Sequence, residues 1–508
     1  MSDRTSFALI VPENFIQATR DSGYKTLGSA LAELVDNAFE AKANQVSVSI
    51  EKVEQQGVED VRVSVADNGR GMNADTVRHA LQFGWSSRFN QRDSHGRYGM
   101  GLPNASLSHA RRVEVWSSPD GKTASASWLD VDEVVARAMS ISPVSHVSIT
   151  DFRRFCPSGR GTIVTWSRCD RLVDRKLGPL SRRLRAELGR LFRYQLWAGK
   201  RLQINGEAVM PFDPLFEKKG ANLVGAKSFG PEVPYETEVP GASPRRTSVV
   251  KVRFTELPIR QWHSLSNNEK NANGIAKNAG VSIVRAGREI DRGWFFMGQK
   301  RKENYDDWWR CEVLFEPDLD ELFGVTHTKQ EIHPGDKLLS ILVPDMERIA
   351  RELNGRARRA FLEVKGDAAS RESEKLAERH DSLLEPPREA GVAGKKSSRQ
   401  LQRGERGRVG GLEYRLRFQR LDSPCLYHPE LDGSRLTVVL NEAHPLVRAS
   451  FGTDARTRVE ANKSRKDVEL MILAAARTEL NLADNKQAKM WIKTFRQSWS
   501  RTLATFLS

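Results

Sequence analysis

The sequence has few cysteines, no long apolar run and fewer acidic than basic residues. Only four cysteines occur in 508 residues, too few and too far apart for a disulfide framework or a zinc knuckle. No stretch approaches the ~18 consecutive apolar residues of a membrane span, and the amino-terminal MSDRTSFALIVPENF holds no apolar core of a secretory signal. We therefore expect a protein of the cytoplasm that does not work in a membrane.

The charge that is present is mostly positive. Lys and Arg number 80 against 65 Asp and Glu, which gives a formal net charge of +15. This excess favours an anionic partner, with nucleic acid first and an acidic membrane surface second. At roughly 150 residues per domain, the length predicts about three domains.

The hydrophobic pattern predicts an α+β protein. From Leu27 to Ala41 apolar residues recur every three or four positions, as in an amphipathic helix, whereas Val46–Ile50 and Val61–Val65 alternate like half-buried strands. Asn205-Gly206 is a hairpin signal, and Leu436–Leu440 is a predicted strand. Between Val364 and Gly411 charged and small residues dominate, as in a solvated linker or a mobile helix.

These features divide the chain into three folded regions and a linker. We expect an α+β domain at 1–171, a second α/β domain at 172–361, a charged linker at 362–411 and a small carboxy-terminal α/β domain at 412–508.

Three polar residues, Glu33, Asn37 and Glu40, follow one another at steps of four and three along the first predicted helix. This spacing places them on one face, with the leucines on the opposite side. Taken alone, the pattern also fits the charged outer face of a surface helix. Two glycine-containing segments favour a binding site instead.

The first segment is Asp67-Asn-Gly-Arg-Gly-Met72, which follows directly on the second strand. Asp67 continues the inward-facing parity of the valines before it, so its carboxylate needs hydrogen-bond donors, and the amino group of a purine is one. Gly69 and Gly71 allow a sharp turn and the close approach of a flat ring.

The second segment is Gly96-Arg-Tyr-Gly-Met-Gly101, which leads into a predicted helix with Pro103 in its first turn. A helix amino terminus behind glycines offers free N–H groups to phosphate. A P-loop is excluded, because Gly394-Lys-Lys-Ser397 has Glu389 in place of the first glycine and a lysine in place of the hydroxyl residue. A Rossmann site is excluded because Gly69-Arg-Gly71 lacks the third glycine and the acidic ribose contact.

The order and spacing of these segments resemble the GHKL superfamily, the Bergerat-fold ATPases named for gyrase, the ninety-kilodalton heat-shock chaperone, histidine kinases and MutL. The resemblance covers the N-box (Glu33–Ala41), the adenine box (Asp67–Gly71), the lid box (Gly96–Gly101) and the late Gly161-Thr162 box. One departure is Glu40, where the chaperone, MutL and Microrchidia patterns usually have aspartate. It puts a secondary contact in doubt, since Glu33 and Asn37 are present.

The resemblance implies ATP and Mg²⁺ as cofactors. Glu33 would orient and deprotonate the attacking water, Asn37 would hold Mg²⁺, and Asp67 would accept from the adenine amino group while Thr162 shares a water. The nucleotide contacts that it implies are Asn37, Asp67, Gly69, Gly71, Met72, Gly96, Gly99, Gly101 and Thr162.

A histidine kinase would share this pocket, but it lacks a hydrolytic carboxylate at Glu33 and normally ends soon after its last nucleotide box. Here Asn278–Ile290 and Leu319–Gln330 resemble the transducer domain of gyrase, MutL, the chaperone and Microrchidia proteins. In that domain a loop lysine reaches the γ-phosphate, which makes Lys329 the matching catalytic candidate; the plain alternative is an exposed lysine. Phe83–Ser86 and Phe212–Phe216 look most like Microrchidia-type ATPases and their bacterial relatives.

For such proteins the resemblance implies an ATP-dependent homodimer that acts as a DNA clamp or remodeller, in bacteria often in defence against phage or in restriction. The arginines between Arg356 and Arg417 fit DNA contact, or simply a solvated run of charge. His428, Asp432 and His444 form no defensible catalytic group. A chaperone-like ATPase with a protein client remains the alternative, and partner subunits stay open.

Overall fold

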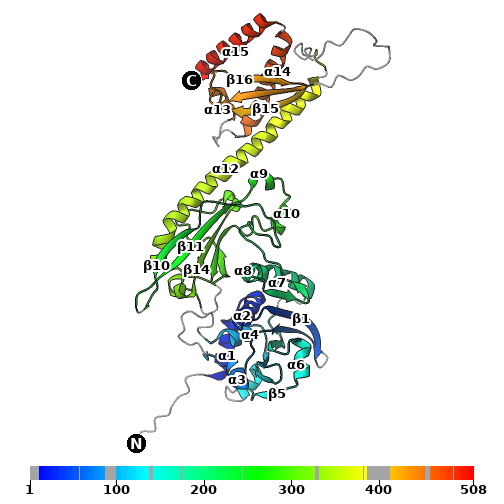
Figure 1. Ribbon diagram of the computed structural model, residues 1–508, viewed down its shortest axis with the longest axis vertical. Coiled ribbons are helices and arrows are strands. Elements are labelled where there is room, and N and C mark those ends of the chain that lie inside the picture. The colour runs from blue at the N-terminus through cyan, green and yellow to red at the C-terminus, as the bar shows by residue number, and fades with distance from the viewer. Residues whose placement is uncertain are drawn as a thin grey trace, which may run out of the picture. The chain divides into compact units, whose positions relative to one another are not determined.

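The computed structural model describes residues 11–55, 58–85, 99–136, 141–172, 176–242, 244–326, 331–381, 383–385, 412–451, 458–483 and 485–507. The chain divides into two compact units, Met1–Asn354 and Gly355–Ser508. Both contain helices and sheets, so the expectation of an α+β protein is confirmed (Figure 1). Within the described ranges, no helix has the length and apolar character that a membrane crossing requires.

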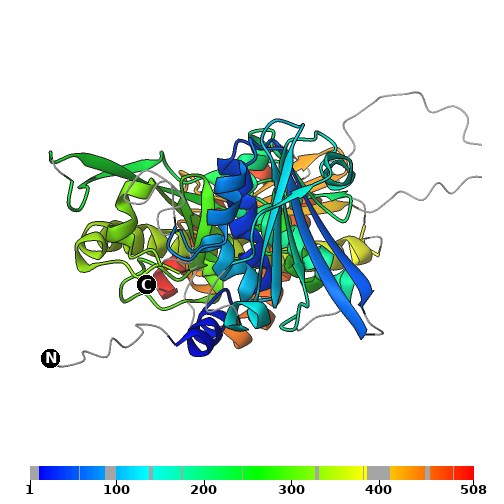
Figure 2. The same ribbon diagram turned by 90° about the horizontal axis from the view of Figure 1, so that it is seen from below.

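The first unit is built on an eight-stranded sheet of β1 (Gln45–Gln55), β2 (Val58–Asp67), β3 (Arg112–Ser118), β4 (Ala124–Asp130), β5 (Ser145–Val147), β6 (Gly161–Ser167), β7 (Arg201–Ile204) and β8 (Glu207–Ala208). Their order across the sheet is β5-β4-β3-β6-β2-β1-β7-β8. β1 and β2 form a long antiparallel pair, seen as the blue strands in Figure 2, whose register brings Val46 opposite Asp67. The two strands predicted from alternating valines are therefore confirmed.

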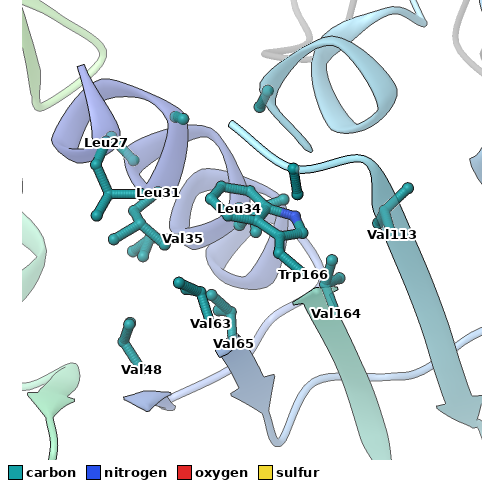
Figure 3. Packing of buried hydrophobic residues seen from close by; sticks show 14 of the residues in the cluster. Leu27, Leu31, Leu34, Val35, Val48, Val63, Val65, Val113, Val164 and Trp166 are labelled. Atoms are coloured by element: carbon teal, nitrogen blue, oxygen red, sulfur yellow. The ribbon is translucent and has the colours of Figure 1, made fainter. Parts of the chain in front are cut away.

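The helices that accompany this sheet are α1 (Pro12–Asp21), α2 (Leu27–Glu40), α3 (Ala74–Ala80), α4 (Gly101–Leu107), α5 (Val131–Ala136), α6 (Ile149–Phe155), α7 (Leu177–Leu191) and α8 (Arg193–Trp197). α2 begins at a capping box, in which the Thr26 hydroxyl accepts from the Ser29 N–H and the Ser29 hydroxyl accepts from the Thr26 N–H. Its apolar side, with Leu31, Leu34 and Val35, packs against the sheet valines and Trp166 (Figure 3). The helix predicted from Leu27 onward is confirmed.

The hairpin predicted at Asn205-Gly206 joins β7 to β8, and both residues have positive φ, 50° and 78°. β7 pairs in parallel with β1, so the hairpin belongs to the first sheet. The sheet thus continues beyond residue 171, where we expected the first domain to end. The reason is that β7 supplies backbone partners to the otherwise open edge of β1, a long-range pairing that no local signal announces.

A second sheet in the same unit consists of β9 (Lys227–Ser228), β10 (Val233–Glu238), β11 (Thr247–Glu256), β12 (Gly280–Arg285), β13 (Arg288–Gly293) and β14 (Trp309–Phe315). Its order is β10-β11-β14-β12-β13, and β9 pairs with β11. The accompanying helices are α9 (Ile259–Trp262), α10 (Asn267–Ala272), α11 (Asp320–Phe323) and α12 (Asp336–Asp381), with short 3-10 turns at Asn304–Trp308 and Pro317–Leu319. Leu338, Leu342 and Met346 of α12 complete the core of this sheet.

Buried charges join α7 and α8 to the second sheet. Glu289 of β13 accepts from Arg190 Nε at 2.5 Å and from Arg193 Nη1 at 2.6 Å. Glu312 of β14 accepts from Arg193, from Arg253 Nε at 2.7 Å and from the Tyr194 hydroxyl at 2.7 Å. Burial acts to raise the pKa of Glu289 and Glu312, but the adjacent guanidiniums outweigh it and hold both pKa values below the ordinary value. We call these two arginines and two glutamates (Arg190, Arg193, Glu289, Glu312) the joint cluster.

The second unit contains a three-stranded sheet of β15 (Glu413–Gln419), β16 (Tyr427–Asp432) and β17 (Arg435–Asn441), with β17 in the middle. Its helices are α13 (Pro445–Phe451), α14 (Arg458–Leu482) and α15 (Lys486–Leu507). The predicted strand at Leu436–Leu440 is confirmed. Part of the expected linker is helical, because α12 continues to Asp381, whose carboxylate accepts from the Leu412 N–H and from Arg477.

Candidate nucleotide site

The polar face of α2 is the first element of the candidate site. Glu33 is only 4% exposed, so the alternative of an exposed charged face is wrong for this residue, while Asn37 and Glu40 are half-buried. The Tyr24 hydroxyl donates to Glu33 Oε2 at 3.2 Å. α2 therefore holds a buried carboxylate one helical turn before an amide side chain.

The amino terminus of α4 meets this carboxylate. A Cβ added at Gly101 would lie 2.1 Å from Glu33 Oε1, so a larger residue there would displace the Glu33 carboxylate from this position. Gly99, two residues earlier, has a φ of +62° and accepts through its carbonyl from the Gly84 N–H at 3.0 Å. The structure brings Glu33 and Gly101 together, and it places Gly99 against Gly84 and Trp85.

Asp67 ends β2 opposite Thr162 of β6. It is 8% exposed, and its Oδ1 accepts from the Gly69 N–H at 2.7 Å. Burial raises the pKa of Asp67 to about 6, although the backbone N–H groups of Gly69 and Thr162 act in the opposite direction. A buried carboxylate whose hydrogen-bond donors are backbone amides is suited to accept from a further neutral donor.

The turn after Asp67 is held against two other segments. Gly69 packs on the end of α2, because a Cβ there would lie 2.8 Å from the Ala41 carbonyl. Gly71 has a φ of +65°, and a Cβ on it would lie 2.1 Å from the carbonyl of Ser118. Asn68 anchors the turn from the other side, since its Oδ1 accepts from the N–H groups of Asn44 and Gln45 at 3.0 Å each.

Ser117 of β3 links the remaining predicted residues and was missed by the sequence analysis. Its hydroxyl donates to the Gly161 carbonyl at 2.9 Å and accepts from the Met72 N–H at 2.8 Å. Since the only hydrogen of that hydroxyl points to Gly161, the Thr162 hydroxyl, 2.9 Å away, donates to Ser117 and keeps its own lone pairs free to accept. The signal was present, because Ser117 continues the inward parity of Val113 and Val115.

Two predicted residues, Gly96 and Lys329, lie outside the described residues. Shortly after Lys329, the carboxylate of Glu331 pairs with Lys25 at 2.8 Å, and the Ile332 N–H donates to Asp291 at 3.0 Å. Lys25 directly precedes the cap of α2. The segment after Lys329 therefore reaches the domain that carries Glu33 and Asn37.

The residues present fit a nucleotide with Mg²⁺ better than a metal held by protein alone. In the described part of the chain, no group of three or more His, Cys, Asp or Glu side chains could ligate an ion. Mg²⁺ commonly takes only one or two protein ligands and completes its shell with phosphate and water. The amide oxygen of Asn37 suffices as such a ligand when a nucleotide supplies phosphate.

The amino-terminal part of the chain is similar to known ATPases. Residues 24–162 match the family of histidine kinase-, DNA gyrase B- and HSP90-like ATPases. Protein MICRORCHIDIA 4 of Arabidopsis thaliana is 26% identical over 31% of this chain and 20% of that protein. ATPase MORC2B of Mus musculus is 37% identical over 18% of this chain and 9% of that protein.

The chain thus matches a fifth or less of the length of these two relatives. Among solved structures, the crystal structure of the N-terminal domain of a DNA repair protein covers 66% of this chain and 98% of its own, at 15% identity and a TM-score of 0.39.

Proposed function

Because residues 24–162 form a GHKL-type ATPase domain similar to that of Microrchidia proteins, we propose that this chain binds and hydrolyses ATP with Mg²⁺, that ATP closes two copies into a dimer, and that the closed dimer acts on DNA. Two buried carboxylates carry the proposal. Asp67 accepts from the backbone N–H groups of Gly69 and Thr162, and Glu33 lies against Gly101 at the amino terminus of α4.

Recognition of the base is assigned to Asp67 and Thr162. The Asp67 carboxylate accepts from the adenine amino group, and the Thr162 hydroxyl, whose hydrogen goes to Ser117, accepts from a water shared with the base. Gly69, Gly71 and Met72 form the wall beside the ring. Gly96, Gly99 and Gly101 offer backbone N–H groups to the phosphates.

Hydrolysis is assigned to Glu33 and Asn37. Phosphoryl transfer needs positioning and charge neutralisation more than covalent chemistry. Glu33 orients the attacking water and takes its proton. Asn37 would hold Mg²⁺, which would supply neutralisation of the phosphate charge. The Tyr24 hydroxyl, 3.2 Å from Glu33 Oε2, keeps the carboxylate oriented.

Lys329 is proposed as the sensor of the γ-phosphate. The pairing of Glu331 with Lys25 supports this role, because it directs the segment after Lys329 toward α2. A lysine at the terminal phosphate interacts with ATP much more than with ADP, which supplies the differential affinity a switch needs. Lys329→Ala should spare ADP binding but impair hydrolysis and dimer formation; normal dimerisation of this variant with a non-hydrolysable analogue, seen by light scattering, would reject the sensor role.

Action on DNA is supported by the net charge of +15 and by exposed arginines, among them Arg358 and Arg359 of α12. If the analogue-bound dimer encloses a duplex, it should hold circular plasmid at salt concentrations that release linear DNA. Equal salt resistance on both forms would reject enclosure. The predicted role in phage defence is tested separately by plating phage on cells with and without the active protein.

A protein client is the second candidate, and one observation favours it. α15 exposes Trp491 at 64% and Phe495 at 69%, and exposed apolar side chains in a row are typical of protein contacts. Salt-insensitive or absent duplex binding, with or without the analogue, would favour this candidate over DNA.

A further inference from the structure

The first unit contains a cavity beside α7. It has a volume of about 550 Å³ and is lined mainly by residues of α7, α10 and β13. This volume lies within the ~300–1,000 Å³ typical of small-molecule sites. None of the residues assigned to ATP or Mg²⁺ lines it.

Two buried guanidiniums line this cavity. Arg190 is 7% exposed and donates through Nε to Glu289, but its Nη1 finds no hydrogen-bond acceptor within the described ranges. Arg288 is 4% exposed and pairs with Asp36 at 2.9 Å, while its Nε likewise finds no acceptor there. A buried charged donor without an acceptor is costly, so each of these two nitrogens needs an acceptor that the described residues do not supply.

Three further cations, Arg183, Lys277 and Arg292, line the cavity from exposed positions. Lys277 forms no ion pair with any residue that the structure describes. The lining therefore has buried cations, Arg190 and Arg288, and a second set of cations that is exposed to solvent. A ligand with two separated anionic groups matches this arrangement better than a single small ion.

The carboxylates of the lining are already engaged. Glu289 belongs to the joint cluster, and Asp291 accepts from the N–H groups of Arg292 and Ile332. Burial raises the pKa of Glu187, although the positive charges of Arg183 and Arg292 act in the opposite direction. Five cations against three carboxylates, 5 − 3, leave the lining two positive charges in excess.

The pKa of Arg190 is lowered, which agrees with the excess of positive charge in the cavity lining. Burial lowers the pKa of Arg190, and the positive charges of Arg292 and Arg193 act in the same direction although Glu289 opposes them. An anion in the cavity would relieve this repulsion.

We propose that this cavity binds a small polyanion with at least two phosphate or carboxylate groups, one placed against Arg190 and Arg288 and another held by Arg183 and Lys277. The residues of this site are not those assigned to ATP. Arg288 connects the site to α2, because its partner Asp36 directly precedes Asn37.

Calorimetry on the full chain, without Mg²⁺ and at low salt, tests the proposal with inorganic pyrophosphate and with citrate as probes. The double variant Arg183→Gln/Lys277→Gln removes two exposed cations of the lining. Arg182→Gln is the matched control, since Arg182 is the exposed neighbour of Arg183 on α7 and does not line the cavity. We expect the double variant to bind about tenfold more weakly or worse, as for a lost bond to a charged group, and the control to bind like the wild type.

The two probes distinguish the source of the anion. Pyrophosphate binding alone indicates a phosphorylated ligand, and citrate binding alone indicates a polycarboxylate. Absence of binding with both probes overturns the proposal. Equal affinity of the wild type and the double variant for a probe overturns it as well. Pyrophosphate that binds in the nucleotide site instead of this cavity would give that second result.

Thermal unfolding supplies a second readout. A saturating probe should raise the unfolding temperature of the wild type and of Arg182→Gln, but not that of the double variant, because only a ligand that binds the folded state stabilises it. Unfolding of all three proteins without probe shows that they are folded. ATP binding is measured apart from these titrations, so a failure of the proposed ATPase leaves their outcome readable.

Discussion

Asp67 and Glu312 are both buried carboxylates, yet the protein surrounds them differently. Glu312 is 0% exposed and accepts from two guanidiniums and a phenol, whereas Asp67 is 8% exposed and accepts from backbone N–H groups. The pKa of Glu312 is accordingly lowered and that of Asp67 is raised to about 6. The difference indicates that Glu312 is satisfied within the chain, while Asp67 still has acceptor capacity for a ligand.

The largest expected effect is on turnover. Glu33→Ala should reduce ATP hydrolysis by the ~10²–10⁴-fold that a general base contributes, while nucleotide binding stays close to that of the wild type. Steady-state hydrolysis and calorimetry measure the two quantities. Glu51→Gln, an exposed substitution on β1, is the control, and wild-type turnover in Glu33→Ala would remove Glu33 as the base.

The next effect is on stability, at the joint cluster. Glu312→Gln leaves buried guanidiniums without their carboxylate, which should lower the free energy of unfolding by ~3–5 kcal/mol. Urea unfolding of the first unit measures it. Glu331→Gln breaks an ion pair between two solvent-exposed side chains, and its unfolding curve should not move. If the two variants have the same free energy of unfolding, the buried ion pairs of the joint cluster stabilise the protein no more than the exposed Lys25–Glu331 pair does.

Asp67→Asn should weaken ATP binding without lowering the stability of the fold, whereas Glu312→Gln should lower stability. It replaces a charged acceptor by an amide, so ATP affinity should fall by at least the ~1.5–3 kcal/mol of a hydrogen bond to a charged group, about 10- to 150-fold. Its unfolding temperature at pH 7 should equal or exceed that of the wild type, because a buried charge is removed. Unchanged affinity in calorimetry would take Asp67 out of the pocket.

The smallest effect is on pH dependence, and its sign differs between the two carboxylates. The folded-state pKa of Asp67 is raised from 3.8 to about 6, so its contribution to stability is fully present below pH 4 and is lost as pH rises through 6. The lowered pKa of Glu312 works oppositely, since its contribution is present above the ordinary value and is lost as pH falls. Asp67→Asn should therefore be relatively more stable at pH 7 than at pH 4, and an identical pH profile to wild type would contradict the raised pKa.

Much of the candidate site was predictable because its signals are local. Helical spacing put Glu33 and Asn37 on one face, and strand parity put Asp67 inward, since both patterns depend only on residues a few positions apart. Ser117 shared the same inward parity, but a serine among valines carries no chemical label until Met72, Gly161 and Thr162 are seen around it. The nucleotide contacts of all these residues stay predictions, and Gly96 and Lys329 also lie outside the described residues.

The pattern of the sequence by itself determined the helix at Leu27, the paired strands before Asp67 and the glycine turns, because each follows from periodicity or from a φ that local residues must adopt. Only the tertiary structure decided that β7 joins the first sheet and that Arg190 and Arg193 are buried. In the sequence these arginines belong to a basic helical stretch; in the fold they meet Glu289 and Glu312, about a hundred residues away in the chain. Burial of a charge depends on partners that only long-range packing brings together, and no local pattern contains that information.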